Sequence, residues 1–293
     1  MLYRRRILLA LLQAIGDGLQ RVDFQKHLFL FTRAQRTPAF DFIPYKFGCF
    51  SFIAESDRQI LIEQGKLLDA DGWIRSRNTD FADSLNDHDR VALIAHKRRF
   101  GQLRGADLVR YVYREYPYYA INSTIAAGLL TDEELARVQQ ARPKVSSVAL
   151  LTIGYEGKSI EAYLNQLVEQ NVDILCDVRR NPFSRKYGFS KRRLQQAVEG
   201  IGIAYRHYAD LGIPSAKRKE LNTQADYDRL FDYYEQEILP DGVSDLEDIM
   251  SLLENGKRVA LTCFELHSQQ CHRSRIAKAL TEHTQWQYHL LNI

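Results

Sequence analysis

The feature that most constrains the fold is a series of short, continuously apolar runs between residues 148 and 293. The runs at 148–153 (VALLTI), 173–178 (DILCDV) and 259–264 (VALTCF) are typical of strands buried on both faces. Further strands are expected at 203–207 and 287–291, and the intervening segments have helical spacing at 159–171, 190–200, 226–239, 245–254 and 273–281. Alternating strands and helices predict a parallel sheet covered on both faces, an open, Rossmann-like α/β domain.

The first half of the chain has the periodicity of helices. Apolar residues recur at three- and four-residue spacing over 4–15, 22–33, 53–64 and 91–99, and residues 65–74 are expected to form a short hairpin with an Asp71-Gly72 turn. This outline, together with the stretch Ile43-Pro44-Tyr45-Lys46-Phe47-Gly48, resembles a winged-helix-like domain. The polar segment 139–147 contains Pro143 and separates the two patterns, so we predict domains at 1–142 and 148–293.

Composition limits the class of protein. A length of 293 residues fits two domains, and an apolar share of 45% with 26% charged residues excludes a disordered chain. Four widely spaced cysteines favour a reduced, intracellular setting, and no apolar run reaches the ~20 residues of a membrane span. Residues 1–20 have the outline of a signal peptide but lack a small-residue cleavage site. We therefore expect a cytoplasmic protein with no membrane partner.

Polar residues follow the predicted strands at their carboxyl ends, where open parallel sheets bind ligands. Tyr155 follows the first strand. Asp177, Arg179, Arg180 and Ser184 follow the second. The strand at 259–264 is followed by Glu265 and then by a cluster that leads into a helix: Cys271, His272, Arg273 and Arg275.

Several of these motifs resemble one family. Thr152-Ile153-Gly154-Tyr155, Asp177-Val178-Arg179 with Pro182 and Ser184, Gly188-Phe189-Ser190, and Cys263-x-Glu265 followed by Cys271-His272-Arg273 are similar to motifs of the domain-of-unknown-function 488 family, in the same order. The resemblance covers residues 148–293. It implies an α/β fold with a polar pocket at the strand ends, and it implies no particular reaction.

The residues themselves predict an anion site. Seven basic side chains and no acidic one lie between Arg179 and Arg193, and Arg273 and Arg275 stand at a helix start, which favours a negative charge. We expect Tyr155, Arg179, Arg180, Ser184, Arg273 and Arg275 to bind a phosphorylated small molecule. A solvated basic surface is the alternative for the arginines, and a buried core position is the alternative for Tyr155.

Four residues are candidates for catalysis. Asp177 and Glu265, at the ends of neighbouring predicted strands, could act as acid or base or could orient the arginines. Cys271 beside His272 at a helix start is a candidate nucleophile. Cysteines that simply pack under the sheet are the alternative.

No cofactor is assigned. Gly154-x-x-Gly157 is too short for a dinucleotide fingerprint, and we predict no metal site. Zinc or iron held by Cys263, His267, Cys271 and His272 remains the alternative, although no C-x-x-C pair is present.

The function that we predict combines both halves. The α/β domain would bind a nucleotide or a nucleic-acid phosphate in an arginine-lined pocket, with hydrolysis as the candidate reaction. The N-terminal domain would dock nucleic acid through Lys46, Arg75 and Arg77. The alternatives are a non-enzymatic DNA-binding regulator with an anion-sensing domain and a thiol or metal redox protein. Self-association as a homodimer is left open.

Overall fold

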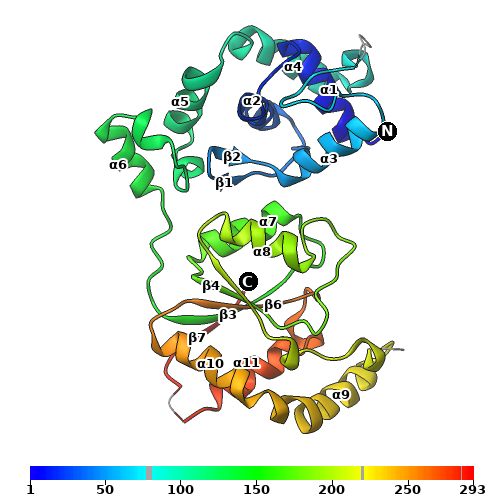
Figure 1. Cartoon of the computed structure of the whole chain (residues 1–293), viewed down its shortest axis with the longest axis vertical. Helices are drawn as coiled ribbons and strands as arrows, with labels where there is room; N and C mark the ends of the chain where they lie inside the picture. Colours follow the sequence, from blue (N-terminus) through cyan, green and yellow to red (C-terminus); the bar gives the residue numbers. More distant parts are fainter. Residues whose placement is uncertain (77–80, 219–220, 285) are drawn as a thin grey trace. The chain divides into compact units, whose positions relative to one another are not determined.

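A computed structural model describes residues 1–293 except 77–80, 219–220 and 285. The chain divides into two compact units, Met1–Arg142 and Pro143–Ile293. Figure 1 labels most of the elements of both. None of the helices in the described part of the chain has the length and apolar character needed to cross a bilayer.

The N-terminal unit is mainly helical. Its helices are α1 (Tyr3–Ile15), α2 (Arg21–Ala34), α3 (Phe52–Glu63), α4 (Asp87–Phe100), α5 (Gly105–Glu115) and α6 (Asp132–Gln140). The apolar positions of α1 and α2 form much of its core, with Leu8, Leu12 and Phe24 fully buried. All four helices expected from the periodicity are present.

The β-hairpin of this unit differs in position from the one expected. Strands β1 (Ile43–Tyr45) and β2 (Gly48–Phe50) pair antiparallel, while residues 65–74 contain no strand. In that region Leu67 pairs with Arg75 as an antiparallel bridge, flanked by backbone hydrogen bonds from Leu68 N–H to the Ile74 carbonyl and from Ser76 N–H to the Lys66 carbonyl, and Trp73 pairs with Leu19. Trp73 stacks on Phe24 with ring centroids 3.7 Å apart, so this segment packs onto α2.

The C-terminal unit is an α/β domain with a five-stranded parallel sheet. Its strands are β3 (Ala149–Gly154), β4 (Ile174–Asp177), β5 (Ala204–His207), β6 (Val259–Cys263) and β7 (His289–Asn292). Its helices are α7 (Ile160–Glu169), α8 (Lys191–Glu199), α9 (Gln224–Tyr233), α10 (Val243–Glu254) and α11 (Arg273–Thr281). The alternation expected from the sequence is confirmed, as is the parallel pairing.

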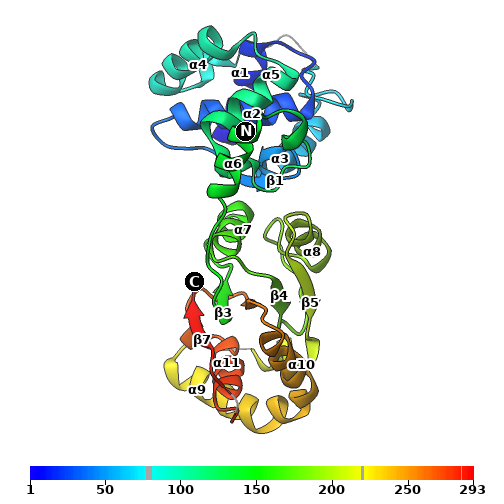
Figure 2. The same cartoon turned by 90° about the vertical axis from the view of Figure 1, so that its left-hand side faces the viewer.

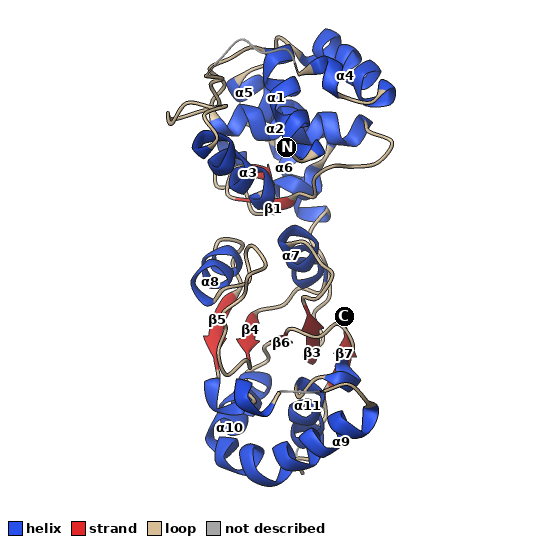
Figure 3. Ribbon diagram, turned by 90° about the vertical axis from the view of Figure 1, so that its right-hand side faces the viewer, coloured by secondary structure: helices blue, strands red, loops and turns tan. Residues whose placement is uncertain are grey.

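Helices cover both faces of this sheet. In Figures 2 and 3, α7 and α8 lie on one face, and α10 and α11 lie on the other. The strand order is β5-β4-β6-β3-β7, so β6 lies between β4 and β3. The central strands β3, β4 and β6 are buried along their whole length, whereas the edge strand β7 is exposed. This explains why the central strands are continuously apolar in sequence.

The strand order differs from the 3-2-1-4-5-6 order of dinucleotide-binding sheets, because β6 is inserted next to β3. The insertion has a direct effect on the chemistry at the strand ends. Gly154 is in register with Cys263, and Asp177 is in register with Thr262. The residues that follow β3, β4 and β6 therefore meet at one edge of the sheet.

Candidate functional site

A pocket of about 320 Å³ lies at the carboxyl ends of β3, β4 and β6. Its lining comes from four segments of the chain that are distant in sequence. The residues are Tyr155, Arg179, Arg180, Asn181, Phe183, Ser184, Arg185, Ile213, Ser215, Arg218, Cys263 and Phe264. Four arginines thus share one hollow at the edge where open parallel sheets bind ligands.

Two glycines allow the segments around this pocket to approach closely. A Cβ atom on Gly154 would lie 1.9 Å from the carbonyl oxygen of Glu265, and a Cβ atom on Gly212 would lie 2.0 Å from the backbone nitrogen of Arg180. Both contacts are with backbone, which cannot swing away as a side chain can. Any larger residue would push the segments after β6 and β4 out of position.

Arg179 is the buried arginine of the pocket. Its Nε donates a hydrogen bond of 2.7 Å to Asp177 Oδ1, and its Nη1 donates to the Tyr155 hydroxyl and to the Phe189 carbonyl. Burial lowers the pKa of Arg179, but the hydrogen bond and charge of Asp177 outweigh burial and raise it overall. Arg179 therefore stays charged in a fixed orientation.

Asp177 is fully occupied by these contacts. Its Oδ1 also accepts from the Arg179 backbone N–H, and its Oδ2 accepts from the Tyr205 hydroxyl at 2.6 Å. The side chain is fully buried. Of the two roles expected from the sequence, this geometry fits orientation of Arg179, because no carboxylate oxygen is directed into the pocket.

Tyr155 combines the two alternatives considered for it. Its ring is stacked on Phe189, with centroids 4.3 Å apart, and only 3% of the residue is exposed. Its hydroxyl nevertheless contacts Arg179, and the residue forms part of the pocket wall. It is a core residue that also holds a pocket arginine.

The other pocket arginines differ in how they are paired. Arg180 pairs with exposed Asp210 at 2.6 Å, and Arg218 pairs with Glu265 at 2.6 Å. Within the described residues, Arg185 has neither an ion-pair nor a hydrogen-bond partner and is exposed. Arg185 thus contributes a positive charge to the pocket that no carboxylate in the described part of the chain neutralises.

Two aromatic side chains at the pocket are exposed. Phe183 is 74% exposed and Phe264 is 43% exposed, and both belong to the lining. Large exposed aromatics next to arginines are typical of surfaces that bind bases or other flat groups. The sequence analysis did not single out either residue.

A cluster of two thiols and an imidazole adjoins the pocket, which one of the thiols, Cys263, helps to line. The ligand atoms of Cys263, Cys271 and His272 all lie within 4.8 Å of one another, and these residues are almost completely buried. His272 Nδ1 is 3.7 Å from Cys263 Sγ and 3.9 Å from Cys271 Sγ. Cys263 Sγ and Glu265 Oε2 are 3.3 Å apart, within hydrogen-bond distance.

The two thiols have opposite acidities. Burial raises the pKa of both. For Cys263, a hydrogen bond from Cys271 and the proximity of His272 and Arg218 outweigh burial, so its pKa falls well below the ordinary value. The pKa of Cys271 lies well above its ordinary value, because of burial and its contact with Cys263. Cys263, which lines the pocket, is therefore the better candidate thiolate, whereas the sequence favoured Cys271.

Glu265 is the carboxylate closest to this cluster. Burial and the neighbouring Cys263 raise its pKa, although Arg218 lowers it. His267, which the sequence analysis considered as a fourth metal ligand, is exposed and lies outside the cluster. Glu265, and not His267, is the residue that lies beside the thiol of Cys263.

Arg273 and Arg275 do not reach the pocket. Arg273 is buried, and its guanidinium donates to the carbonyl oxygens of Glu265 and Leu266 at 2.5 and 3.0 Å. Arg275 pairs with Glu235 and lies over the Phe231 ring. We expected both to bind the anion. Instead, α11 directs Arg273 beneath the loop that follows β6 and directs Arg275 toward residues 231–235.

The residues proposed to dock nucleic acid lie in different settings. Lys46 is exposed at the turn between β1 and β2. Arg75 forms an ion pair with Asp17 at 2.8 Å, and its side chain is largely buried. Arg77 lies outside the described residues. The structure therefore presents Lys46 to solvent but holds Arg75 within its own unit.

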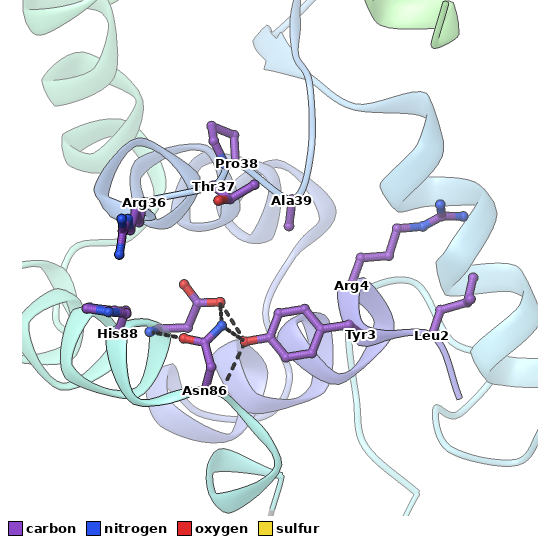
Figure 4. Close-up of a pocket in the computed structure, with 10 residues that line it drawn as sticks. Leu2, Tyr3, Arg4, Arg36, Thr37, Pro38, Ala39, Asn86 and His88 are labelled. Carbon is purple, nitrogen blue, oxygen red and sulfur yellow. Dashed lines mark hydrogen bonds between the residues drawn. The ribbon is translucent and has the colours of Figure 1, made fainter. Parts of the chain in front are cut away.

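The N-terminal unit has a pocket of its own, of about 450 Å³ (Figure 4). The Tyr3 hydroxyl donates to Asp89 at 2.6 Å and accepts from Asn86, and these three side chains form a polar network at one side. Arg36 and His88 also line the pocket. The sequence analysis did not predict this pocket.

Arg218 is the main site residue that sequence reasoning missed. It lies in the basic stretch Lys217-Arg218-Lys219, after the predicted strand at 203–207. Residues that follow a strand at its carboxyl end are the signal that points to the other site residues. Arg218 follows β5, which ends at His207, at a greater distance, so this signal is weaker for it.

Comparison with known proteins identifies the C-terminal unit at the level of its family. No curated protein and no solved structure matches the chain. The model of one family, described as domain of unknown function DUF488, matches residues 159–280, a range that includes Arg179, Ser184, Cys263, Glu265 and Cys271. Together with the motifs at the strand ends, this match establishes that the C-terminal unit contains a DUF488 domain.

Proposed function

We propose that the C-terminal unit binds a phosphate-bearing ligand, a nucleotide or a phosphate group of nucleic acid, in the pocket at the strand ends. The observation that carries the proposal is the grouping of Arg179, Arg180, Arg185 and Arg218 around one hollow. Arginine suits phosphate because its planar guanidinium donates two parallel hydrogen bonds to two oxygens.

The charge balance of the pocket supports this ligand class. Arg179, Arg180 and Arg218 each face one carboxylate, and Arg185 adds a further positive charge. The pair of Arg180 with Asp210 is exposed, and exposed pairs contribute about 1 kcal/mol or less, so an anion can compete for Arg180. The pocket is therefore complementary to a ligand with at least one negative charge.

The exposed aromatic rings favour a nucleotide over a bare phosphate. Phe183 and Phe264 flank the arginines, and stacking of a base on an aromatic side chain contributes about 1–3 kcal/mol. A ligand with a phosphate on the arginines and a base on Phe183 would use both features.

Hydrolysis is the reaction that we propose for this pocket. Cys263 lines the pocket, Glu265 Oε2 lies 3.3 Å from its sulfur and His272 Nδ1 lies 3.7 Å from it, so these are the groups that we propose for the reaction. Asp177 has the separate role of positioning Arg179.

The nucleic-acid role of the N-terminal unit belongs to the same proposal. Lys46 and the 47% exposed Phe47 stand together at the tip of the β1–β2 hairpin, where a cation and an aromatic ring face solvent. We also propose that the N-terminal unit is a winged-helix-like domain. For the C-terminal unit we propose a Rossmann-like fold, because helices cover both faces of its parallel sheet.

The test is a binding measurement on the full chain with a nucleoside diphosphate and with inorganic phosphate, by calorimetry. We expect Arg185→Ala to weaken both ligands by at least about tenfold, the loss for a charge-assisted hydrogen bond. Arg192→Ala is the matched control, because Arg192 is exposed in the same basic run but does not line the pocket.

Phe183→Ala distinguishes binding of the base from binding of the phosphate. It should weaken the nucleotide by about tenfold and leave inorganic phosphate unchanged. Equal affinities of Arg185→Ala, Arg192→Ala and the wild-type chain would contradict the proposed pocket.

A further inference from the structure

We propose that Cys263, Cys271 and His272 bind a zinc ion. Their three donor atoms lie within 4.8 Å of one another in a buried site, which is the first requirement for a shared ion. The inference goes beyond phosphate binding and does not depend on it, since the arginines of the pocket would hold an anion with or without a metal. With zinc bound, Cys263 and His272 would act in the proposed hydrolysis as metal ligands and not as free groups.

The hydrogen bonding of His272 directs a lone pair toward the thiols. Its Nε2 lies 2.8 Å from the carbonyl oxygen of Val178. A carbonyl can only accept, so the proton of the neutral ring is on Nε2 and Nδ1 carries the lone pair. Metal-binding histidines almost always donate their other ring N–H to a carbonyl or carboxylate in this way. The ring is therefore held in the tautomer that a zinc ligand needs.

The loop that joins the two cysteines is fixed by contacts of its own. Cys263 ends β6, and residues 264–270 return the chain to Cys271 at the start of α11. Arg273 holds this loop through the carbonyl oxygens of Glu265 and Leu266, and Gly154 packs against it from β3. This explains why Arg273 is buried, and it gives the ligands a defined arrangement without a C-x-x-C motif.

The donor set selects the metal. Two thiolates and one imidazole are soft to borderline ligands that suit zinc and do not suit magnesium or calcium. Two thiolate charges also neutralise Zn²⁺, so the ion would add no net charge to a buried position. Three protein ligands leave the fourth position of a tetrahedral zinc site open, and one of them, Cys263, lines the pocket.

Arg218 competes with the ion for one donor. Its Nη2 lies 2.9 Å from His272 Nδ1, and its Nη1 donates to Glu265 Oε1 at 2.6 Å. On zinc binding, the Nδ1 lone pair passes from the guanidinium to the metal, while the ion pair with Glu265 can remain. Arg218→Ala should therefore bind zinc more tightly than the wild-type chain.

The test measures metal binding by the full chain, purified without chelators. We expect one equivalent of zinc by elemental analysis after exposure to zinc and removal of unbound ions. Titration with Co²⁺ should give a sulfur-to-metal charge-transfer band. Cys263→Ser, Cys271→Ser and His272→Gln should each lose more than about 100-fold in zinc affinity, because loss of a second-shell group alone costs 10–100-fold. Cys176→Ser is the matched control, a buried thiol of β4 outside the cluster, and it should keep the ion.

Arg218→Ala leaves Cys263, Cys271 and His272 unchanged, so it tests the zinc site while all three proposed ligands are present. We expect its zinc affinity to rise by about tenfold, the effect of one hydrogen bond from a charged donor. The proposal is overturned if the wild-type chain gives no charge-transfer band, if Cys263→Ser and Cys271→Ser bind zinc as the wild-type chain does, or if Arg218→Ala leaves the affinity unchanged. Loss of phosphate binding in Arg185→Ala would bear only on the proposed function.

Discussion

At the scale of single residues, two of the buried arginines of the C-terminal unit, Arg179 and Arg273, show how the same side chain acquires different roles. Arg179 is held by the carboxylate of Asp177 and borders the pocket, whereas Arg273 is held by backbone carbonyl oxygens and supports a loop. Both follow predicted strand ends and both lie in family-like motifs. Their position in the sequence predicted that they would be near the site but not which way each would point.

Gly154→Ala is the residue-scale prediction. The added methyl group would lie 1.9 Å from the Glu265 carbonyl oxygen, so β3 and the loop after β6 must separate. We expect a loss of about 3 kcal/mol in the unfolding free energy of the C-terminal unit, the upper range for overpacking. Urea unfolding followed by Trp286 fluorescence measures it.

Gly128→Ala serves as the control for this substitution, because a Cβ atom there meets nothing within 4 Å. Its unfolding, followed by Trp73 in the N-terminal unit, should change by less than about 0.5 kcal/mol. A Gly154→Ala protein as stable as the wild-type chain would show that the approach of these segments is not required.

At the scale of elements, the predicted helices and strands of the C-terminal unit agree closely with those observed, because buried central strands and amphipathic helices have distinct periods. The expected hairpin at 65–74 is present only as a single antiparallel bridge between Leu67 and Arg75, too short to form strands. An Asp-Gly turn between short apolar pairs is a local signal, and beyond this bridge Trp73 packs on Phe24 and pairs with Leu19 in place of a longer hairpin.

Helix caps provide the element-scale prediction. Ser159 and Ser190 both precede a helix, but only the Ser159 hydroxyl accepts a hydrogen bond from the helix, from the Ala162 N–H at 3.0 Å. Ser159→Ala should therefore cost about 1 kcal/mol of unfolding free energy, and Ser190→Ala only a few tenths. Parallel urea titrations of the two variants make the comparison, and equal losses would contradict it.

At the scale of the whole molecule, the N-terminal unit should be sensitive to acid. His27 on α2 and His96 on α4 are buried, with His27 Nδ1 3.2 Å from His96 Nε2. Burial and the charge of Arg104 lower the pKa of His27 to about 4, and burial and His27 lower that of His96 to about 3. In the unfolded chain both titrate near 6.5.

The sign of the effect follows from proton uptake. Between pH 6.5 and about 4 the unfolded state binds protons that the folded state excludes, so stability is complete above this range and falls as the pH falls. We expect the unfolding free energy to drop by up to about 1.4 kcal/mol per pH unit for each histidine. Urea titrations followed by Trp73 fluorescence measure the slope. His96→Gln should reduce it by about half, and an unchanged slope would exclude this origin.

The sequence by itself determined the alternation of strands and helices, the parallel sheet and the gathering of polar groups at the strand ends, because burial and backbone geometry impose periods that are readable along the chain. Only the tertiary structure decided the strand order, and with it which side chains meet. Insertion of β6 between β4 and β3 brings Cys263 to the pocket, a distant loop supplies Arg218, and α11 turns Arg273 and Arg275 away. These contacts depend on long-range packing and on the direction of single side chains, for which neighbouring residues in the sequence carry no signal.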